Sequence, residues 1–525
     1  MLKSAFFARI FVFAFFTAVL AACGGSDSVT SRVMNVASDE ADFIAVGNIS
    51  RAFDQMGIKV DDGHIELPRY IKNLFDRSYN SNSSKVEENI ENLRGIDFNS
   101  VAVCGKVKGS DVDFVMAFGV SNANDLYDFL NETDARVDMG NEGDYITIGD
   151  RQGQILIQKN DAYVVYEDGR MLGGRKAVVA LERWLEKAKS QPLDGWKIDY
   201  LNAQAVAAYW MSSKMAVYGM SSREKQEIIS KIGIIPGVSF DDLSLGVRLD
   251  LDGNKAKLNL TVFNDGKIME FPYEERFNTD LLNYAGADDM LVVGAAISNS
   301  GMNLLRIAVN NQIDEQIESY TQDLRYSMDE YDADYSRRSI AETEAFRTLI
   351  NNTIDNMEGS MMLAMGPDDA NLKEFVYRPD NHMHFVLAMD FKNGKARPVA
   401  KLLTDFFKEH DSHARVNSTS SGYEVTIRSQ KIYIDILGNH LVVSNRPVTQ
   451  GYNNGIDKDV FSDTWLAAQI FVSADQTLIR NYDLPFGINL SATAHGVSAD
   501  AEVSFPDSKE NFVPTLVGII EAMSR

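Results

Sequence analysis

DFIAVG at residues 42–47 and DMLVVG at residues 289–294 resemble each other at a separation of 247 residues. Each is an acidic residue followed by a short aliphatic run that ends in glycine. Apolar runs of this length, rich in β-branched residues, are typical of β-strands. The likeness predicts that the 525-residue chain contains two related folding units.

Three further matches follow the first in the same order along the chain. Ala135-Arg136-Val137 matches Ala414-Arg415-Val416 at a separation of 279, which also carries Gly143, Thr147, Ile155 and Ile157 onto Gly422, Thr426, Ile434 and Ile436. Asp194 and Trp196 match Asp463 and Trp465 at 269, and Leu245, Val247, Gly253, Leu260 and Val262 match Ile488, Leu490, Gly496, Val503 and Phe505 at 243. The order predicts an internal repeat, with a first domain over 37–284 and a second over 285–525.

The local pattern within the first half predicts an α+β fold. Strands are expected over 43–48, 101–107, 114–120, 145–148, 154–158, 163–166, 243–250 and 255–263. Helices are expected near 122–131 and 176–189. Because short turns join most of these strands and helices interrupt them irregularly, the sheets should be mainly antiparallel.

The second half carries an extra segment over residues 310–345. Its apolar and aromatic residues recur three or four positions apart, which predicts one strongly acidic amphipathic helix. These residues are Ile313, Ile317, Tyr320, Leu324, Met328, Tyr331 and Tyr335. The stripe packs on its own domain or docks a partner, and in the second case Tyr320, Tyr331 and Tyr335 are the candidate contact residues.

The N-terminus has the form of a bacterial lipoprotein signal peptide. Lys3 and Arg9 precede an uncharged apolar run over 10–20, which is too short to span a bilayer comfortably. Leu20-Ala21-Ala22-Cys23 resembles a lipobox. The sequence therefore predicts removal of residues 1–22, acylation of Cys23, a lipidated tether over 23–36, and attachment to the cell envelope, with the outer membrane favoured and the facing side left open.

The charge of the chain argues against nucleic acid as a partner. Without Lys3 and Arg9 it has 49 basic and 75 acidic residues, a formal charge of −26, and no basic cluster that would attract phosphates. With Cys23 lipidated, Cys104 has no cysteine with which to form an intrachain disulfide. Cys104 lies in an apolar run and is expected to be a buried, inert thiol.

The motifs that could form a catalytic or metal-binding site are each more simply interpreted as ordinary structural features. Asp250-Leu251-Asp252-Gly253-Asn254 suggests a hairpin turn more than a calcium loop, because the later bidentate glutamate is missing. His382 with His384, and Glu409, His410, Asp411 and His413, could ligate a metal but lack zincin spacing, so solvent-facing histidines are expected. Ser222 and Lys225 are interpreted as a polar helix start. No catalytic residue, metal or cofactor is predicted.

The lipobox, the strand over 42–47 leading into residues 50–57, and the GIDF-x-x-VAV run over 95–103 together resemble a Bacteroidetes lipoprotein family catalogued only as a domain of unknown function. The resemblance implies an envelope lipoprotein without established catalytic residues. Because the sequence offers no catalytic constellation, we expect a non-catalytic binding or scaffolding lipoprotein that serves a protein or glycan partner. An envelope hydrolase with two carboxylates about 5–10 Å apart and a periplasmic carrier of an apolar ligand are the alternatives.

Overall fold

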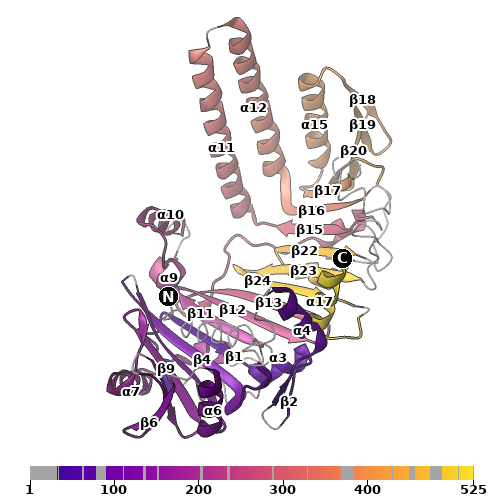
Figure 1. Ribbon diagram of the computed structural model, residues 1–525. Coiled ribbons are helices and arrows are strands. Elements are labelled where there is room, and N and C mark those ends of the chain that lie inside the picture. The colour runs from indigo at the N-terminus through magenta and orange to yellow at the C-terminus, as the bar shows by residue number, and fades with distance from the viewer. Residues whose placement is uncertain are drawn as a thin grey trace. The chain divides into compact units, whose positions relative to one another are not determined.

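A computed structural model describes residues 32, 35–61, 64–78, 90–109, 111–133, 137–150, 153–201, 205–232, 237–286, 289–327, 329–367, 383–428, 430–448, 456–472, 487–506 and 508–523 (Figure 1). The chain divides into two compact units. Unit 1 comprises Met1–Met269 and Glu502–Arg525, and unit 2 comprises Glu270–Ala501. In the described part of the chain, no helix has both the length and the apolar character needed to cross a bilayer.

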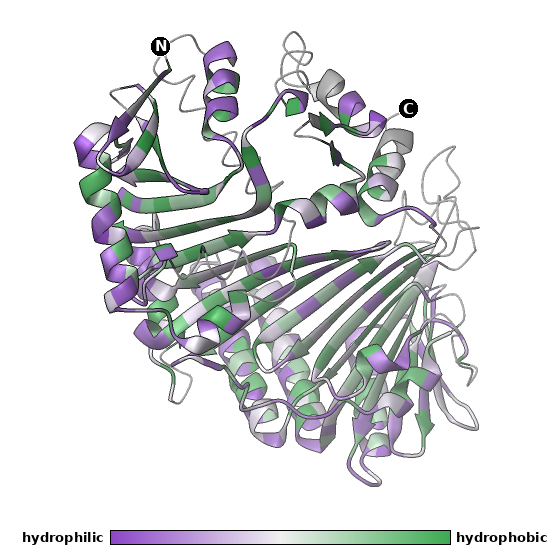
Figure 2. Cartoon of the chain, turned by 90° about the horizontal axis from the view of Figure 1, so that it is seen from below, coloured by the Kyte–Doolittle hydropathy of each residue, from purple (hydrophilic) through white to green (hydrophobic). Residues whose placement is uncertain are grey.

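Helices account for 38% of the structure and strands for 39%, and the strands pair antiparallel, which confirms the α+β class. Hydrophobic residues recur along the strands (Figure 2). The division into units differs from the expected boundary near residue 285. The 3₁₀ helix η2 (Thr279–Tyr284) packs Leu281 and Leu282 into a core of unit 2, while the end of the chain returns to unit 1.

The strands of unit 1 are β1 (Phe43–Gly47), β2 (Lys59–Asp61), β3 (His64–Glu66), β4 (Ile96–Lys108), β5 (Asp111–Val120), β6 (Asp138–Glu142), β7 (Tyr145–Gly149), β8 (Gln154–Gln158), β9 (Asp161–Glu167), β10 (Arg170–Met171), β11 (Ala207–Ser212), β12 (Leu243–Asp252), β13 (Lys255–Asn264) and β14 (Lys267–Ile268). The main pairing order is β14-β13-β12-β11-β1-β4-β5-β9-β8-β7-β6. β10 pairs with β9, and β2 pairs with β3 as a separate hairpin. β1, the first stretch quoted above, is thus an interior strand.

The helices of unit 1 are α3 (Ile49–Met56), α4 (Arg69–Ser78), α6 (Ala123–Thr133), α7 (Gly174–Ser190), α8 (Gly195–Leu201), α9 (Ser213–Ala216), α10 (Ser222–Ile232), the 3₁₀ helix η1 (Phe240–Asp242) and α17 (Phe512–Met523). α7 buries Ala177, Ala180 and Leu181, which lie three or four positions apart, in a core shared with β1, β4, β5 and β11. α17 packs against α3, and Phe512 stacks on Phe505 with ring centroids 5.1 Å apart.

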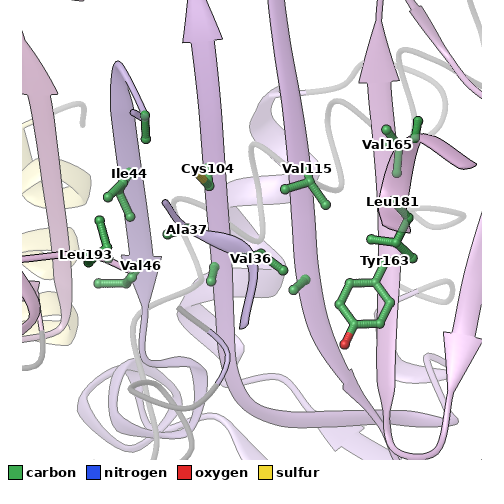
Figure 3. Close-up of a cluster of buried hydrophobic side chains, with 14 of the residues drawn as sticks. Val36, Ala37, Ile44, Val46, Cys104, Val115, Tyr163, Val165, Leu181 and Leu193 are labelled. Atoms are coloured by element: carbon green, nitrogen blue, oxygen red, sulfur yellow. The ribbon is translucent and has the colours of Figure 1, made fainter. Parts of the chain in front are cut away.

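The segment before β1 belongs to this core. Val36 and Ala37 are fully or almost fully buried and lie among the side chains of β1, β4 and β5 (Figure 3). Arg32 pairs with Asp97 at 3.1 Å and with Asp161 at 3.0 Å. Residues 32, 36 and 37, which fall within or next to the tether expected over 23–36, are therefore part of unit 1. Cys23 and residues 1–22 lie outside the described residues.

The strands of unit 2 are β15 (Leu291–Ala296), β16 (Met357–Pro367), β17 (Met383–Phe391), β18 (Ala414–Ser418), β19 (Gly422–Ile427), β20 (Gln430–Leu437), β21 (His440–Ser444), β22 (Leu466–Val472), β23 (Ile488–His495) and β24 (Ser498–Ser504), and the division between the units falls within β24. The pairing order is β23-β22-β15-β16-β17-β21-β20-β19-β18. Besides η2, the helices are α11 (Asn299–Tyr326), α12 (Glu330–Asn356), α15 (Ala396–His410) and α16 (Lys458–Phe461).

The prediction of one helix over 310–345 is wrong. α11 and α12 are two helices packed side by side as a hairpin that projects from the strands of unit 2, with α15 beside α12 (Figure 1). The chain reverses around Ser327, and the Asp329 side chain caps α12 by accepting a hydrogen bond from the backbone N–H of Asp332 at 2.8 Å.

Candidate binding surfaces

Three exposed tyrosines and a cluster of acids lie at the free end of the α11–α12 hairpin. Tyr326, Tyr331 and Tyr335 are 80%, 81% and 61% exposed. We call these three side chains the tyrosine tip. Tyr320 is half-buried one to two turns down α11, where Gln316 donates to its hydroxyl at 3.3 Å. The structure therefore exposes Tyr331 and Tyr335 as binding candidates, whereas Tyr320 belongs to the stem. Tyr326 was missed because it lies outside the apolar stripe that drew attention to the others.

The tyrosine tip stands in a negative electrostatic field. Residues 323–335 hold five carboxylates, from Asp323, Asp329, Glu330, Asp332 and Asp334, against the single guanidinium of Arg325, so their formal charge is −4. Asp334 pairs with Arg338, one turn further along α12, at 2.8 Å. Exposed aromatic faces beside carboxylates attract cations, because the ring quadrupole and the negative charge act in the same direction.

The stem below the tip is fixed by bonds between its two helices. Arg347 of α12 pairs with Asp314 of α11 at 2.5 Å, and Arg306 of α11 pairs with Asp355 of α12 at 2.7 Å. Asn310 and Asn351 exchange amide hydrogen bonds at 3.2 Å. At the base, Met302 and Ile354 enter a core that includes Phe391. The tip is therefore held away from the strands on a braced pair of helices.

A second candidate surface is a hollow on unit 1. It has a volume of about 250 Å³ and lies against β1, β4, β5, β11 and β12. Its lining residues are Ala45, Val46, Gly47, Val101, Val103, Met116, Ala207, Ala208, Tyr209, Val247 and Leu249. Tyr209 supplies the only side-chain polar atom of this set, and burial raises the pKa of its hydroxyl.

The histidines considered as possible metal ligands make other contacts in the structure. His384 is not solvent-facing as expected, because its side chain points inward from β17, is fully buried, and places Nε2 2.5 Å from Asp289 Oδ1. His382 lies outside the described residues. The ring of His410 packs against that of Phe406, with centroids 4.7 Å apart and planes tilted by 43°, and the exposed His413 approaches Asp411 of its own turn at 3.5 Å. Within the described ranges, no group of three or more histidine, cysteine or acidic side chains is arranged to hold a metal.

The remaining motifs have the structural roles expected of them. Gly253 lies in the turn between β12 and β13 and has a φ of +56°, a conformation that favours glycine in tight hairpin turns. Asp250 forms an ion pair with Arg51 at 2.8 Å. Ser222 begins α10 next to a capping box formed by Ser221 and Glu224. Cys104 is fully buried, and burial raises the pKa of its thiol to about 12.

Comparisons with known proteins add little to this description. No protein-family model and no curated protein matches the chain. Among solved structures, one titled "Structure of crystal form I of TP0453" is matched over 46% of this chain and 81% of its own, at 11% identity and a TM-score of 0.24. A likeness of that size carries no argument about fold or function.

Proposed function

We propose that this chain is a lipid-anchored, non-catalytic binding protein of the cell envelope that presents the tyrosine tip to a protein partner with a basic surface. The exposure of Tyr326, Tyr331 and Tyr335 at the end of a braced hairpin is the observation that carries the proposal. Tyrosine contributes a large, rigid contact area at low entropic cost and is enriched among the residues that dominate binding energy.

The negative charge of the tip favours some classes of partner over others. A formal charge of −4 over residues 323–335 disfavours anionic surfaces and favours arginine and lysine side chains, which can pair with the carboxylates and stack on the tyrosine rings. A neutral glycan would gain from stacking but not from the charge. A basic protein surface therefore uses both features of the tip.

The anchor is proposed from the lipobox at Cys23. Residues 23–31 would form the tether, since Arg32 is already held by unit 1, and nine residues reach at most about 30 Å when extended. Metabolic labelling with a palmitate analogue tests this. Label that disappears in Cys23→Ala is expected, and label that persists in that variant would contradict the proposal.

The tip is tested by photo-crosslinking in intact cells. A photoreactive amino acid at Tyr331 should give a discrete crosslinked product, whereas the same residue at Glu342, exposed on the stem of α12, should not. Tyr326→Ala with Tyr335→Ala should weaken the product at position 331, as should Glu330→Lys with Asp323→Lys. Equal products at 331 and 342, or a product indifferent to both pairs of substitutions, would contradict the proposal.

We also propose that the units are tandem copies of one ancestral domain. The order β11-β1-β4-β5-β9-β8-β7-β6 in unit 1 has the same form as β22-β15-β16-β17-β21-β20-β19-β18 in unit 2. Two turns also correspond at the separations noted above: Lys159 and Gly438, both with positive φ, at 279, and Gly253 and Gly496 at 243. An experimental structure with a different pairing order in either unit would contradict this.

A further inference from the structure

Three neighbouring strands of unit 1 are apolar on both faces where they pair, over residues 43–47 of β1, 101–105 of β4 and 207–211 of β11. Ile44, Cys104 and Trp210 point into the core shared with α7, while their neighbours Ala45, Val103 and Tyr209 point to the opposite face. An antiparallel sheet with one face in water normally alternates apolar and polar residues, whereas strands covered on both faces are apolar throughout. The second pattern indicates that something apolar covers the face that carries the hollow.

The hollow has a floor of small residues and walls of larger ones. Ala45, Gly47 and Ala207 lie on the adjacent strands β1 and β11, and Met116 and Val103 on one side face Val247 and Leu249 on the other. The apolar surface continues across β12 onto β13, where Leu249 is opposite Leu258 and Val247 is opposite Leu260. Leu249, Leu258 and Leu260 are 36%, 39% and 38% exposed.

The chemistry of this surface favours a hydrocarbon chain over a peptide. β1 is hydrogen-bonded to β4 and β11, and these in turn to β5 and β12, so the ladders already use the backbone groups of the floor. A peptide laid across it would bury N–H and C=O groups without partners, at a cost that an alkyl chain does not have. A volume of about 250 Å³ is also smaller than a pocket for a whole drug-sized ligand.

We propose that this hollow, with the adjoining leucines of β12 and β13, binds one acyl chain of a zwitterionic membrane phospholipid. The formal charge of −26 without residues 1–22 disfavours an anionic headgroup, and a chain tethered to a membrane has zwitterionic lipids at hand, so the supply of ligand rests on the anchoring proposed above. The headgroup stays in solvent, because the hollow itself offers only the Tyr209 hydroxyl as a polar side-chain group.

The test is calorimetric titration of the chain from residue 23 onward, carrying Cys23→Ser, with lauroyl lysophosphatidylcholine below its micellar concentration. We expect saturable binding, none with the chainless headgroup glycerophosphocholine, and weaker binding of lauric acid. Ala45→Phe places a ring in the hollow and should weaken binding at least tenfold. Val179→Phe, which adds the same ring at an exposed position of α7, should leave binding unchanged.

A second variant keeps the proposal testable if Ala45→Phe fails to fold. Val103→Thr with Val247→Thr preserves side-chain shape and adds two hydroxyls, which should weaken binding by about tenfold or more with an unchanged melting temperature. Absence of saturable binding, equal losses in Val179→Phe, tighter binding of lauric acid, or a dimer that Ala45→Phe dissociates would each overturn the proposal. Tyr331→Ala should not affect this titration, so failure here and failure of the tip proposal are distinguishable.

Discussion

The buried pair of Asp289 and His384 gives the sharpest stability prediction. Both side chains are fully buried, and Asp289 accepts hydrogen bonds from His384 Nε2 and from the backbone N–H of Gly286, both at 2.5 Å, with Arg446 at 3.7 Å. Asp289→Ala removes the acceptor and leaves these donors inside the protein. Losing the acceptor of a buried donor typically costs about 1–3 kcal/mol for each donor, so with two donors affected we expect a loss of about 2–6 kcal/mol in the stability of unit 2.

Hydrogen exchange followed by mass spectrometry, on peptides that contain β15 and β17, measures this loss locally and avoids assuming one transition for the whole chain. Removing both partners leaves fewer orphaned groups than removing one. The double variant Asp289→Ala with His384→Ala should therefore cost less than the sum of the single variants by about 1–3 kcal/mol. Strict additivity, or a single-variant loss below about 1 kcal/mol, would refute the reasoning.

Three further predictions concern other groups. Cys104 should resist alkylation by iodoacetamide in the folded protein and react fully in urea, since its thiol is buried and its pKa is raised to about 12; rapid labelling of native protein would contradict its burial. The hydrogen bonds from Lys106 and Lys187 lower the pKa of Glu40 from 4.5 to about 2, so the folded state favours the carboxylate, and this stabilisation should be present above pH 4.5 and lost as the pH falls towards 2. Carbon NMR of the Glu40 carboxyl, assigned with Glu40→Gln, should show no titration near pH 4.5. Replacing Tyr326, Tyr331 and Tyr335 together by alanine should change the free energy of unfolding by no more than about 0.5 kcal/mol per site, because these side chains are mostly exposed; a large fall in melting temperature would assign them to packing.

Strands and hairpins were predictable because their signals are local. The expected hairpin over 243–250 and 255–263 corresponds to β12 and β13, and alternation with a turn glycine at 253 was enough to place it. The match of DFIAVG with DMLVVG at a separation of 247 residues does not align the buried positions of the two strands. Ile44 and Val46 are buried, but the residues 247 further on are Leu291 and Val293, which are half-buried, whereas Val292 and Gly294 are buried. A shift of one residue exchanges the faces of a strand, so the literal match at 247 does not bring together residues on equivalent faces of β1 and β15.

The reversal between α11 and α12 was not predictable from periodicity. Apolar residues continue at spacings of three or four from Leu324 through Met328 to Tyr331. A hairpin that happens to preserve this spacing is indistinguishable from one long helix. The available signal was the capping chemistry around Ser327 and Asp329, which a count of apolar residues ignores. The hollow on unit 1 required knowledge of which strands are neighbours, and that information is contained in no single segment.

Arg32 also determines how a mechanical load would enter the protein. Under the proposed anchoring, tension from the membrane would be transmitted through Arg32, whose ion pairs with Asp97 and Asp161 join β4 to β9. Beyond it, the chain runs into β1, which is hydrogen-bonded on both sides, so peeling it from one edge is not possible. If the chain is anchored as proposed, a pull on the anchor would therefore be distributed over several strands at once, and the attachment would resist drag at the membrane surface without a disulfide to reinforce it.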